Sequence, residues 1–120
     1  MVEKIIHIYE PDDLQCGQTV IAMLTGKSVE QIVEECGNKR ETTLKEMRES
    51  LKQNGMEISQ QRSETYQKED LPRVALLSLE TPRCWHWSLY FDGVFYDPEH
   101  GILSDFPESN RKYFWEVKEK

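Results

Sequence analysis

The chain has 120 residues, of which 15 are Lys or Arg and 22 are Asp or Glu, so its formal net charge at pH 7 is -7. A chain of this length buries enough surface to fold as one domain over residues 1–120. The acidic balance argues against nucleic acid as the main partner, because phosphate binding draws its affinity from clustered Lys and Arg. No run approaches the roughly 18 apolar residues of a membrane helix, and the first residues carry no signal-peptide pattern. We therefore expect a soluble, cytoplasmic protein with no membrane segment of its own.

Three short helices are predicted in the first half of the chain. The first is apolar nearly all round after its first turn, which is typical of a buried helix. The second and third begin with a capping box, in which Ser or Thr is followed three residues later by Gln or Glu. A glycine close to the end of each helix is a stop signal. The predicted ranges are Cys16–Thr25, Val29–Cys36 and 44–54.

The second half of the chain has the pattern of antiparallel strands. The strongest signal is a hairpin of residues 84–91 and Val94–Asp97, joined by the two-residue turn Asp92-Gly93. Further strands are predicted over residues 56–60, 73–80 and 113–118, with a loop over 98–107. Helices followed by antiparallel strands indicate an α+β fold, with N-terminal helices packed on a C-terminal antiparallel sheet.

The hairpin register divides its side chains between two faces of the sheet. A two-residue turn places Phe91 opposite Val94 and therefore Ser88 opposite Asp97. The face expected to be buried is apolar and carries Trp85, Trp87, Leu89, Phe91, Val94 and Tyr96. The other face carries His86, Ser88, Tyr90, Phe95 and Asp97. On that face His86 and Asp97 are diagonal neighbours, roughly 7–8 Å apart at the backbone, so the carboxylate is expected to hold the imidazole.

Cys16 is the best candidate for a nucleophile that this histidine would deprotonate. It stands at the start of a predicted helix, where the helix dipole and the unpaired N–H groups favour a thiolate. The same N–H groups are positioned to stabilise an oxyanion. Gly17 has no side chain, so we expect a substrate backbone to approach it closely.

Metal chemistry is the weaker interpretation of the cysteines and histidines. A set of Cys16, Cys84, His86 and His100 lacks the usual zinc-ligand spacings. With Cys36 the chain has three cysteines and no Cys-x-x-Cys pair, which fits a reducing compartment better than a disulfide framework. We expect neither a metal ion nor an organic cofactor.

These residues resemble the papain-like cysteine peptidases of the small bacterial kind, in particular the double-glycine leader peptidases that process bacteriocin precursors. The resemblance rests on the segments CGQTVIAML, SVEQ, LKQNG, VALLSL and HWSLYFDGVFYDP, in this order along most of the chain. It implies a papain-like fold with Cys16 as nucleophile, His86 as base and Asp97 as the carboxylate that orients it. The implied substrate is a peptide or protein.

The sequence departs from the pattern of these peptidases at the oxyanion hole. The peptidases that this chain resembles usually place a Gln about six residues before the nucleophile, and Glu10 stands at that position here. An ionised carboxylate would repel the developing negative charge. Three alternatives follow: Glu10 is protonated, or it points away and Gln15 supplies the amide, or acyl transfer is lost.

The leading functional hypothesis is a cysteine-dependent hydrolase, a peptidase or amidase, with a Cys16–His86–Asp97 triad. One alternative is a catalytically silent papain-like domain that binds a peptide in the same cleft, which Glu10 would favour. Another is an acyl transferase, in which an amine replaces water as the acceptor on the same triad.

Overall fold

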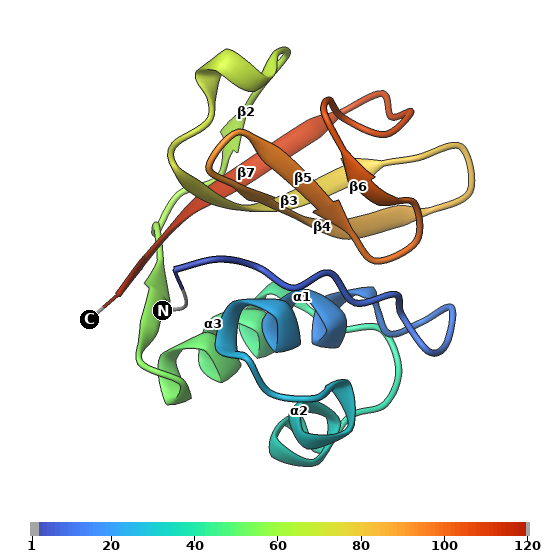
Figure 1. Ribbon diagram of the computed structural model, residues 1–120, viewed down its shortest axis with the longest axis vertical. Coiled ribbons are helices and arrows are strands. Elements are labelled where there is room, and N and C mark those ends of the chain that lie inside the picture. Colours follow the sequence, from blue (N-terminus) through green and yellow to red (C-terminus); the bar gives the residue numbers. More distant parts are fainter. Residues whose placement is uncertain (1–2, 120) are drawn as a thin grey trace.

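The computed structural model describes residues 3–119 as a layer of helices packed on one antiparallel sheet (Figure 1). The helices are α1 (Cys16–Thr25), α2 (Val29–Cys36), α3 (Leu44–Gln53) and the short 3-10 helix η1 (Lys68–Asp70). The strands are β1 (Met56–Ile58), β2 (Ser63–Glu64), β3 (Val74–Glu80), β4 (Trp85–Phe91), β5 (Val94–Asp97), β6 (Gly101–Leu103) and β7 (Lys112–Glu119). The α+β prediction, with N-terminal helices on a C-terminal antiparallel sheet, is confirmed.

The central position of β3 and β4 determines where the helices can pack. The strand order is β1-β7-β3-β4-β5-β6, and β2 pairs with β7 beside this path. The last strand, β7, lies between β1 and β3. This part of the sheet therefore joins strands that are far apart in the sequence. Central strands need cover on both faces, which explains the nearly continuous apolar run of β3. Helix α1 packs against β4 and carries a fully buried apolar surface into the same core.

The local signals for the three α-helices are present in the structure. Helices α2 and α3 both begin with complete capping boxes, in which the cap side chain and the third helical residue bond to each other's backbone. Helix α1 ends at Gly26, whose φ of 78° is the left-handed conformation that favours glycine. Helix α3 ends one residue earlier than predicted, with Asn54 as its cap. None of the helices between residues 3 and 119 is long and apolar enough to cross a membrane.

The predicted hairpin register is confirmed by the pairing of β4 and β5. Phe91 lies opposite Val94, and Leu89 lies opposite Tyr96. Both turn residues have positive φ, 51° at Asp92 and 91° at Gly93, as a type I′ turn requires. His86 and Asp97 therefore share a face of the sheet, as the period of two predicted.

The prediction that only one face of this hairpin is buried was wrong. Leu89 and Phe91 enter the core beneath the helices, but Tyr90 and Phe95 are also buried, in a second core on the opposite face. Trp85, expected in the core, is 49% exposed because it lies at the first position of β4. The second core also contains Ala75, Leu77 and Leu79, with Leu71, Leu103, Phe106 and Phe114 packed against it.

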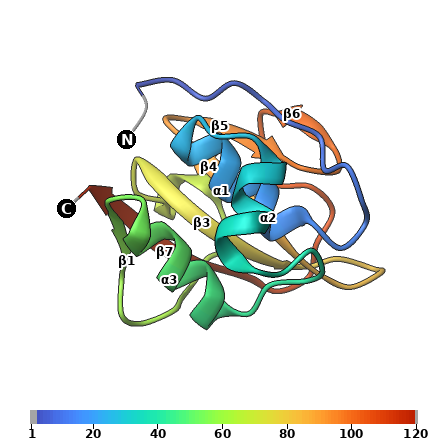
Figure 2. The ribbon, with the colours of Figure 1, turned by 90° about the horizontal axis from the view of Figure 1, so that it is seen from below.

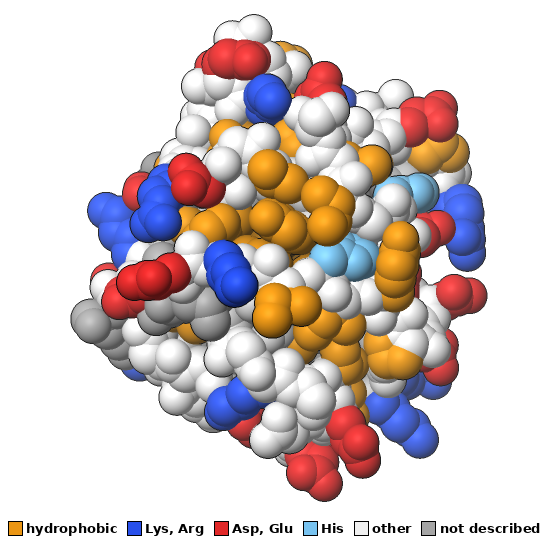
Figure 3. Space-filling view, viewed as in Figure 1, with side chains coloured by type: hydrophobic (Ala, Val, Ile, Leu, Met, Phe, Trp, Pro, Cys, Tyr) orange, Lys and Arg blue, Asp and Glu red, His pale blue; other side chains and the backbone are white. Residues whose placement is uncertain are grey.

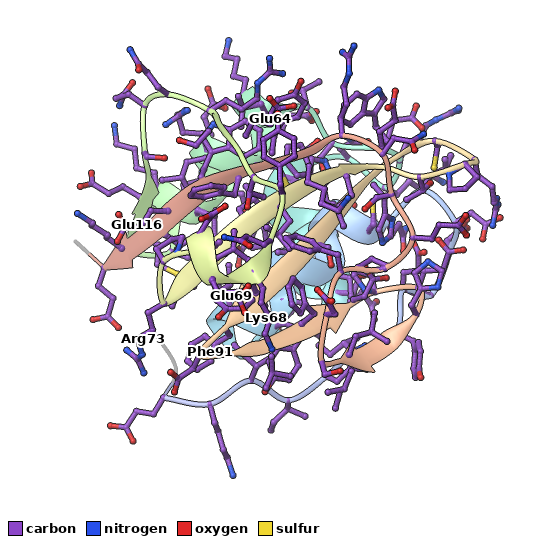
Figure 4. The ribbon with its side chains drawn as sticks, turned by 90° about the horizontal axis from the view of Figure 1, so that it is seen from above. Glu64, Lys68, Glu69, Arg73, Phe91 and Glu116 are labelled. Carbon is purple, nitrogen blue, oxygen red and sulfur yellow. The ribbon has the colours of Figure 1, made fainter. Side chains whose placement is uncertain are left out.

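The second face is covered by segments that the sequence pattern did not reveal. Figure 4 views the sheet from the side away from the helices and shows η1, with Lys68 and Glu69, lying across it. Lys68 Nζ donates to the Ser104 carbonyl at 2.9 Å, which ties η1 to the segment after β6. Residues 98–107 were predicted as a loop but contain β6, and β2 was not predicted. Both strands are too short, at two and three residues, to show a periodic pattern.

The segment before α1 runs beside β5 and β6 along one edge of the molecule (Figure 2). His7 Nε2 forms a hydrogen bond with the Asp97 carbonyl at 2.7 Å, and the Glu10 N–H donates to the Pro98 carbonyl at 2.9 Å. Ile6 and Tyr9 remain largely exposed. Figure 3 shows hydrophobic side chains gathered across the middle of the face over which this segment passes, beside histidine side chains.

Gly17 has a different role from the one expected. A side chain at this buried position would meet other parts of the protein, not an open approach for a substrate. A Cβ here would overlap Thr42 Oγ1 and lie 2.9 Å from Met47 Sδ and 3.1 Å from Trp87 Cδ1. The absence of a side chain at residue 17 therefore allows α1 to pack closely against the segment before α3 and against β4.

We predict that Gly17→Ala lowers the free energy of unfolding by about 1–3 kcal/mol, the usual cost of overpacking a well-packed core. Urea denaturation of the variant and the native chain measures this difference. In a Thr42→Ala background, which removes the oxygen that the new methyl group would meet, the same substitution should cost less. An equal cost in both backgrounds would show that the close packing against Thr42 is not the cause.

Candidate active site

Three elements place Cys16, His86 and Asp97 close together. Cys16 is the first residue of α1, His86 is the second residue of β4, and Asp97 is the last residue of β5. Because α1 packs on β4, the Trp87 N–H points at Cys16 Sγ, 3.5 Å away. Cys16 and His86 also line the same two pockets, and the Cys16 side chain contributes to raising the pKa of His86. The close packing at Gly17, directly after Cys16, holds this end of the helix against the strand.

Asp97 is fully buried, and its carboxylate is surrounded by donors. His86 Nε2 lies 3.0 Å from Oδ1, and Ser88 Oγ donates to Oδ2 at 2.7 Å. The backbone N–H groups of Glu99 and His100 each donate to Oδ1 at 2.9 Å. The Asp97 carboxylate therefore holds the imidazole by Nε2, which leaves Nδ1 for the Cys16 thiol.

The charges of this cluster favour a protonated imidazole. Burial alone would lower the pKa of His86, but its hydrogen bonds to Asp97 and Cys16 and their negative charges raise it to about 10. Burial would likewise raise the pKa of Asp97, but the hydrogen bond and charge of His86, with the Ser88 hydroxyl and the His100 N–H, hold it below its usual value. An imidazolium between a carboxylate and a thiolate is the charge state in which a cysteine attacks a carbonyl.

Two adjoining pockets open on this pair, and Cys16 and His86 line both of them. One has a volume of about 350 Å³ and is walled by the side chains of Trp85, Trp87 and Leu44 among others. The other is narrower, about 100 Å³, and four of its lining residues are acidic. Those four are Glu10, Asp13, Glu41 and Glu99. A substrate segment lying over Cys16 would therefore meet both aromatic surface and carboxylates.

The two residues predicted for the oxyanion hole, Gln15 and Glu10, lie in different surroundings. The Gln15 amide nitrogen donates to the Lys39 carbonyl at 3.0 Å, so this amide is already engaged away from Cys16. Glu10 instead lines the narrow pocket, and its Oε2 is buried without a hydrogen-bond partner among residues 3–119. Burial raises the pKa of Glu10 to about 7; His86 opposes the shift, and nearby carboxylates add to it. In this structure, therefore, Glu10 faces the pocket that Cys16 and His86 line, and the Gln15 amide is bonded elsewhere.

The structure assembles a different group of metal-ligand atoms from the set considered in the sequence. Between residues 3 and 119, atoms of Glu10, His86 and Glu99 lie within 4.8 Å of one another, and neither Cys84 nor His100 belongs to this group. Glu99 already pairs with Arg83, at 3.1 Å. His86 is bonded to Asp97. Two of the three members, His86 and Glu99, are therefore engaged in bonds that a metal ion would have to displace.

Sequence reasoning missed several side chains that position the site. Ser88 was placed opposite Asp97 but was given no role, although a hydroxyl facing a buried carboxylate is a recognisable hydrogen-bond pair. His7 and Thr42 gave no local signal, because they reach the site from distant segments. Thr42 accepts from Trp87 Nε1 through its carbonyl at 3.0 Å, which fixes the indole beside Cys16.

We predict that Asp97→Asn lowers the pKa of His86, because the neutral amide removes the negative charge that stabilises the imidazolium. Titration of the His86 ring protons by NMR measures the shift. Ser88→Ala is the matched control, since it removes a donor to the other carboxylate oxygen and leaves the contact with His86 in place. A His86 pKa that is unchanged in Asp97→Asn would contradict the assignment of Asp97 as the charge partner.

Comparison with known proteins identifies the fold. The sequence matches no protein-family model and has no significant match among curated proteins. Among solved structures it is similar to a double glycine motif protease from an AMS/PCAT transporter in complex with the leader peptide, with a TM-score of 0.68 at 18% identity, covering 98% of this chain and 93% of the other. It is also similar to the peptidase domain of Streptococcus ComA, a bifunctional ABC transporter of a quorum-sensing pathway, with a TM-score of 0.69 at 17% identity, covering 98% of this chain and 100% of the other. The chain therefore has the papain-like fold of double-glycine peptidase domains, as its sequence motifs predicted.

Proposed function

We propose that this chain is a cysteine peptidase that hydrolyses a peptide bond after a double glycine, with Cys16 as nucleophile, His86 as general acid and base, and Asp97 as the carboxylate that orients His86. The observation that carries the proposal is that Cys16 and His86 together line two pockets, with Nε2 of the imidazole held by Asp97. The choice of substrate draws on the similar protease that was solved with its leader peptide.

The proposed reaction has two halves. Cys16 Sγ attacks the scissile carbonyl carbon, and the π electrons move to the carbonyl oxygen. When they return, the C–N bond breaks and the His86 imidazolium gives its proton to the leaving amine. Water, deprotonated by His86, then attacks the thioester, releasing the carboxylic acid product and restoring the thiolate.

The shape of the site suits a substrate that is narrow near the nucleophile. The pocket beside Glu10 has a volume of only about 100 Å³, and glycine residues present no side chain to it. The Trp85 ring stacks on Tyr113 with ring centroids 5.9 Å apart, which gives the wider pocket a rigid aromatic edge. Aromatic surface of this kind accepts apolar side chains from the rest of a bound peptide.

A second candidate function, a peptide-binding domain without turnover, is favoured by the Glu10 carboxyl group in the narrow pocket. If Glu10 carried its charge at the working pH, it would oppose the negative oxygen of the intermediate. Such a domain would bind a double-glycine peptide without cleaving it at that pH.

We predict that the native chain releases 7-amino-4-methylcoumarin from a peptide amide ending in Gly-Gly, and that Cys16→Ala loses this activity by about 10⁶-fold, to the background of the assay. Cys36→Ala is the matched control, because Cys36 is a free thiol at the end of α2 that lines neither pocket and should be dispensable. Binding of the peptide without release of the dye by the native chain would contradict the peptidase and favour the silent binder.

We predict that iodoacetamide alkylates Cys16 faster than the exposed Cys84 at pH 6, although Cys16 is buried. The reason is that His86, whose pKa is raised to about 10, is an imidazolium at this pH and places a positive charge beside the attacking sulfur. Mass spectrometry of the alkylated peptides gives the two rates. His86→Ala should slow Cys16 and leave Cys84 unchanged; equal slowing of both cysteines would indicate a general effect on the fold.

A further inference from the structure

Glu10 is held in the narrow pocket by the backbone of the neighbouring turn. Its N–H donates to the Pro98 carbonyl at 2.9 Å, directly after the carboxylate that orients the imidazole. His7 contacts the Asp97 carbonyl at 2.7 Å, so the segment leading to Glu10 has two attachments to the end of β5. The Glu10 carboxyl group is therefore positioned by the same turn that positions Asp97.

The environment of the Glu10 carboxyl group indicates a hydrogen bond that is made only when a ligand is present. Oε2 is buried and has no partner among residues 3–119, although buried polar atoms are nearly always paired. The pocket that this residue lines is also lined by Cys16 and His86. The oxygen of a carbonyl attacked by Cys16 would occupy this space beside the first turn of α1, where backbone N–H groups have no partners within the helix.

We propose that Glu10, as a neutral acid, donates a hydrogen bond to the oxyanion formed when Cys16 attacks a carbonyl, and that ionisation of Glu10 removes this donor. The proposal rests on the proposed function, because it assigns a role within that reaction. The Glu10 O–H donates without transferring its proton, since the electron pair on the oxygen returns to carbon when the leaving group departs. The proton that the leaving amine needs still comes from His86.

The groups around Glu10 explain how it keeps a proton near neutral pH. Burial is the largest cause of its raised pKa of about 7. His86 on β4 opposes this shift, while Glu99 from the β5–β6 turn, Asp13 from its own segment and Asp97 at the end of β5 add to it. The remaining charged groups lining the pocket are Glu41, from the segment between α2 and α3, and Arg83, which pairs with Glu99. The acid therefore exists mainly in its donor form below about pH 7 and loses that form as the pH rises.

Two reactions of Cys16 Sγ distinguish an oxyanion-donor role of Glu10 from a purely structural role. Acylation of Cys16 by p-nitrophenyl acetate passes through an oxyanion, in which the S–C bond forms before p-nitrophenolate leaves. Alkylation by iodoacetamide forms an S–C bond and expels iodide without any oxyanion. Ionisation of Cys16 and general damage to the fold affect both rates, so the ratio of acylation to alkylation isolates the oxyanion donor. Mass spectrometry of the Cys16 peptide gives both rates.

In the native chain this ratio should fall by about tenfold between pH 6 and pH 8, as a group with a pKa of about 7 changes from mostly protonated to mostly ionised. In Glu10→Gln, whose amide donates at every pH, the ratio should stay constant. In Glu10→Ala it should be about 10²- to 10³-fold below the native value at pH 6, the usual effect of losing one oxyanion donor. Glu41→Gln, which removes another carboxylate from the same pocket, should keep the native pH dependence.

A ratio in the native chain that does not change with pH, or a native ratio in Glu10→Ala, would overturn the role of Glu10. A native chain whose Cys16 is not acylated at pH 6 would overturn it as well. The proposed function fails separately: the pattern of ratios expected above, without cleavage of the Gly-Gly peptide at pH 6, would support the donor role of Glu10 and contradict the peptidase.

Discussion

The buried carboxylate of Asp97 is the constraint on which this arrangement depends. A charged group taken out of water costs several kcal/mol unless hydrogen bonds and an opposite charge replace its hydration. Here an imidazole, a hydroxyl and two backbone N–H groups surround it. They come from β4 and from the turn after β5, so satisfying one carboxylate fixes the hairpin, its turn and the orientation of His86 together.

The second constraint is the distance between α1 and β4. Cys16 reaches His86 only because the helix lies against the strand without a side chain at residue 17. Trp87 strengthens this contact from two sides: its backbone N–H points at the thiol, and its indole donates to the carbonyl of residue 42. The sulfur and the imidazole are thus placed by packing between a helix and a sheet, and not by a local turn.

The two ionisable groups that face Cys16 have pKa values raised for opposite reasons. His86 holds its proton because negative partners stabilise the cation, against the effect of burial. Glu10 holds its proton because burial and neighbouring carboxylates disfavour the anion, against the attraction of His86. In the proposed chemistry this difference matters, since a cation is needed beside the thiolate and a neutral donor beside the oxyanion.

The sequence by itself determined the local structure: the capping boxes of α2 and α3, the Asp92-Gly93 turn and, through the period of two, the shared face of His86 and Asp97. These features depend on residues close together in the chain, where backbone geometry leaves few alternatives. Only the tertiary structure decided that both faces of the hairpin are covered, that Trp85 is exposed, and that β2 and β6 exist. It also decided that the Gln15 amide donates to the Lys39 carbonyl and that the Glu10 N–H donates to the Pro98 carbonyl, because both contacts join segments far apart in the sequence. Alternation assigns side chains to faces, but burial depends on which distant segments cover each face.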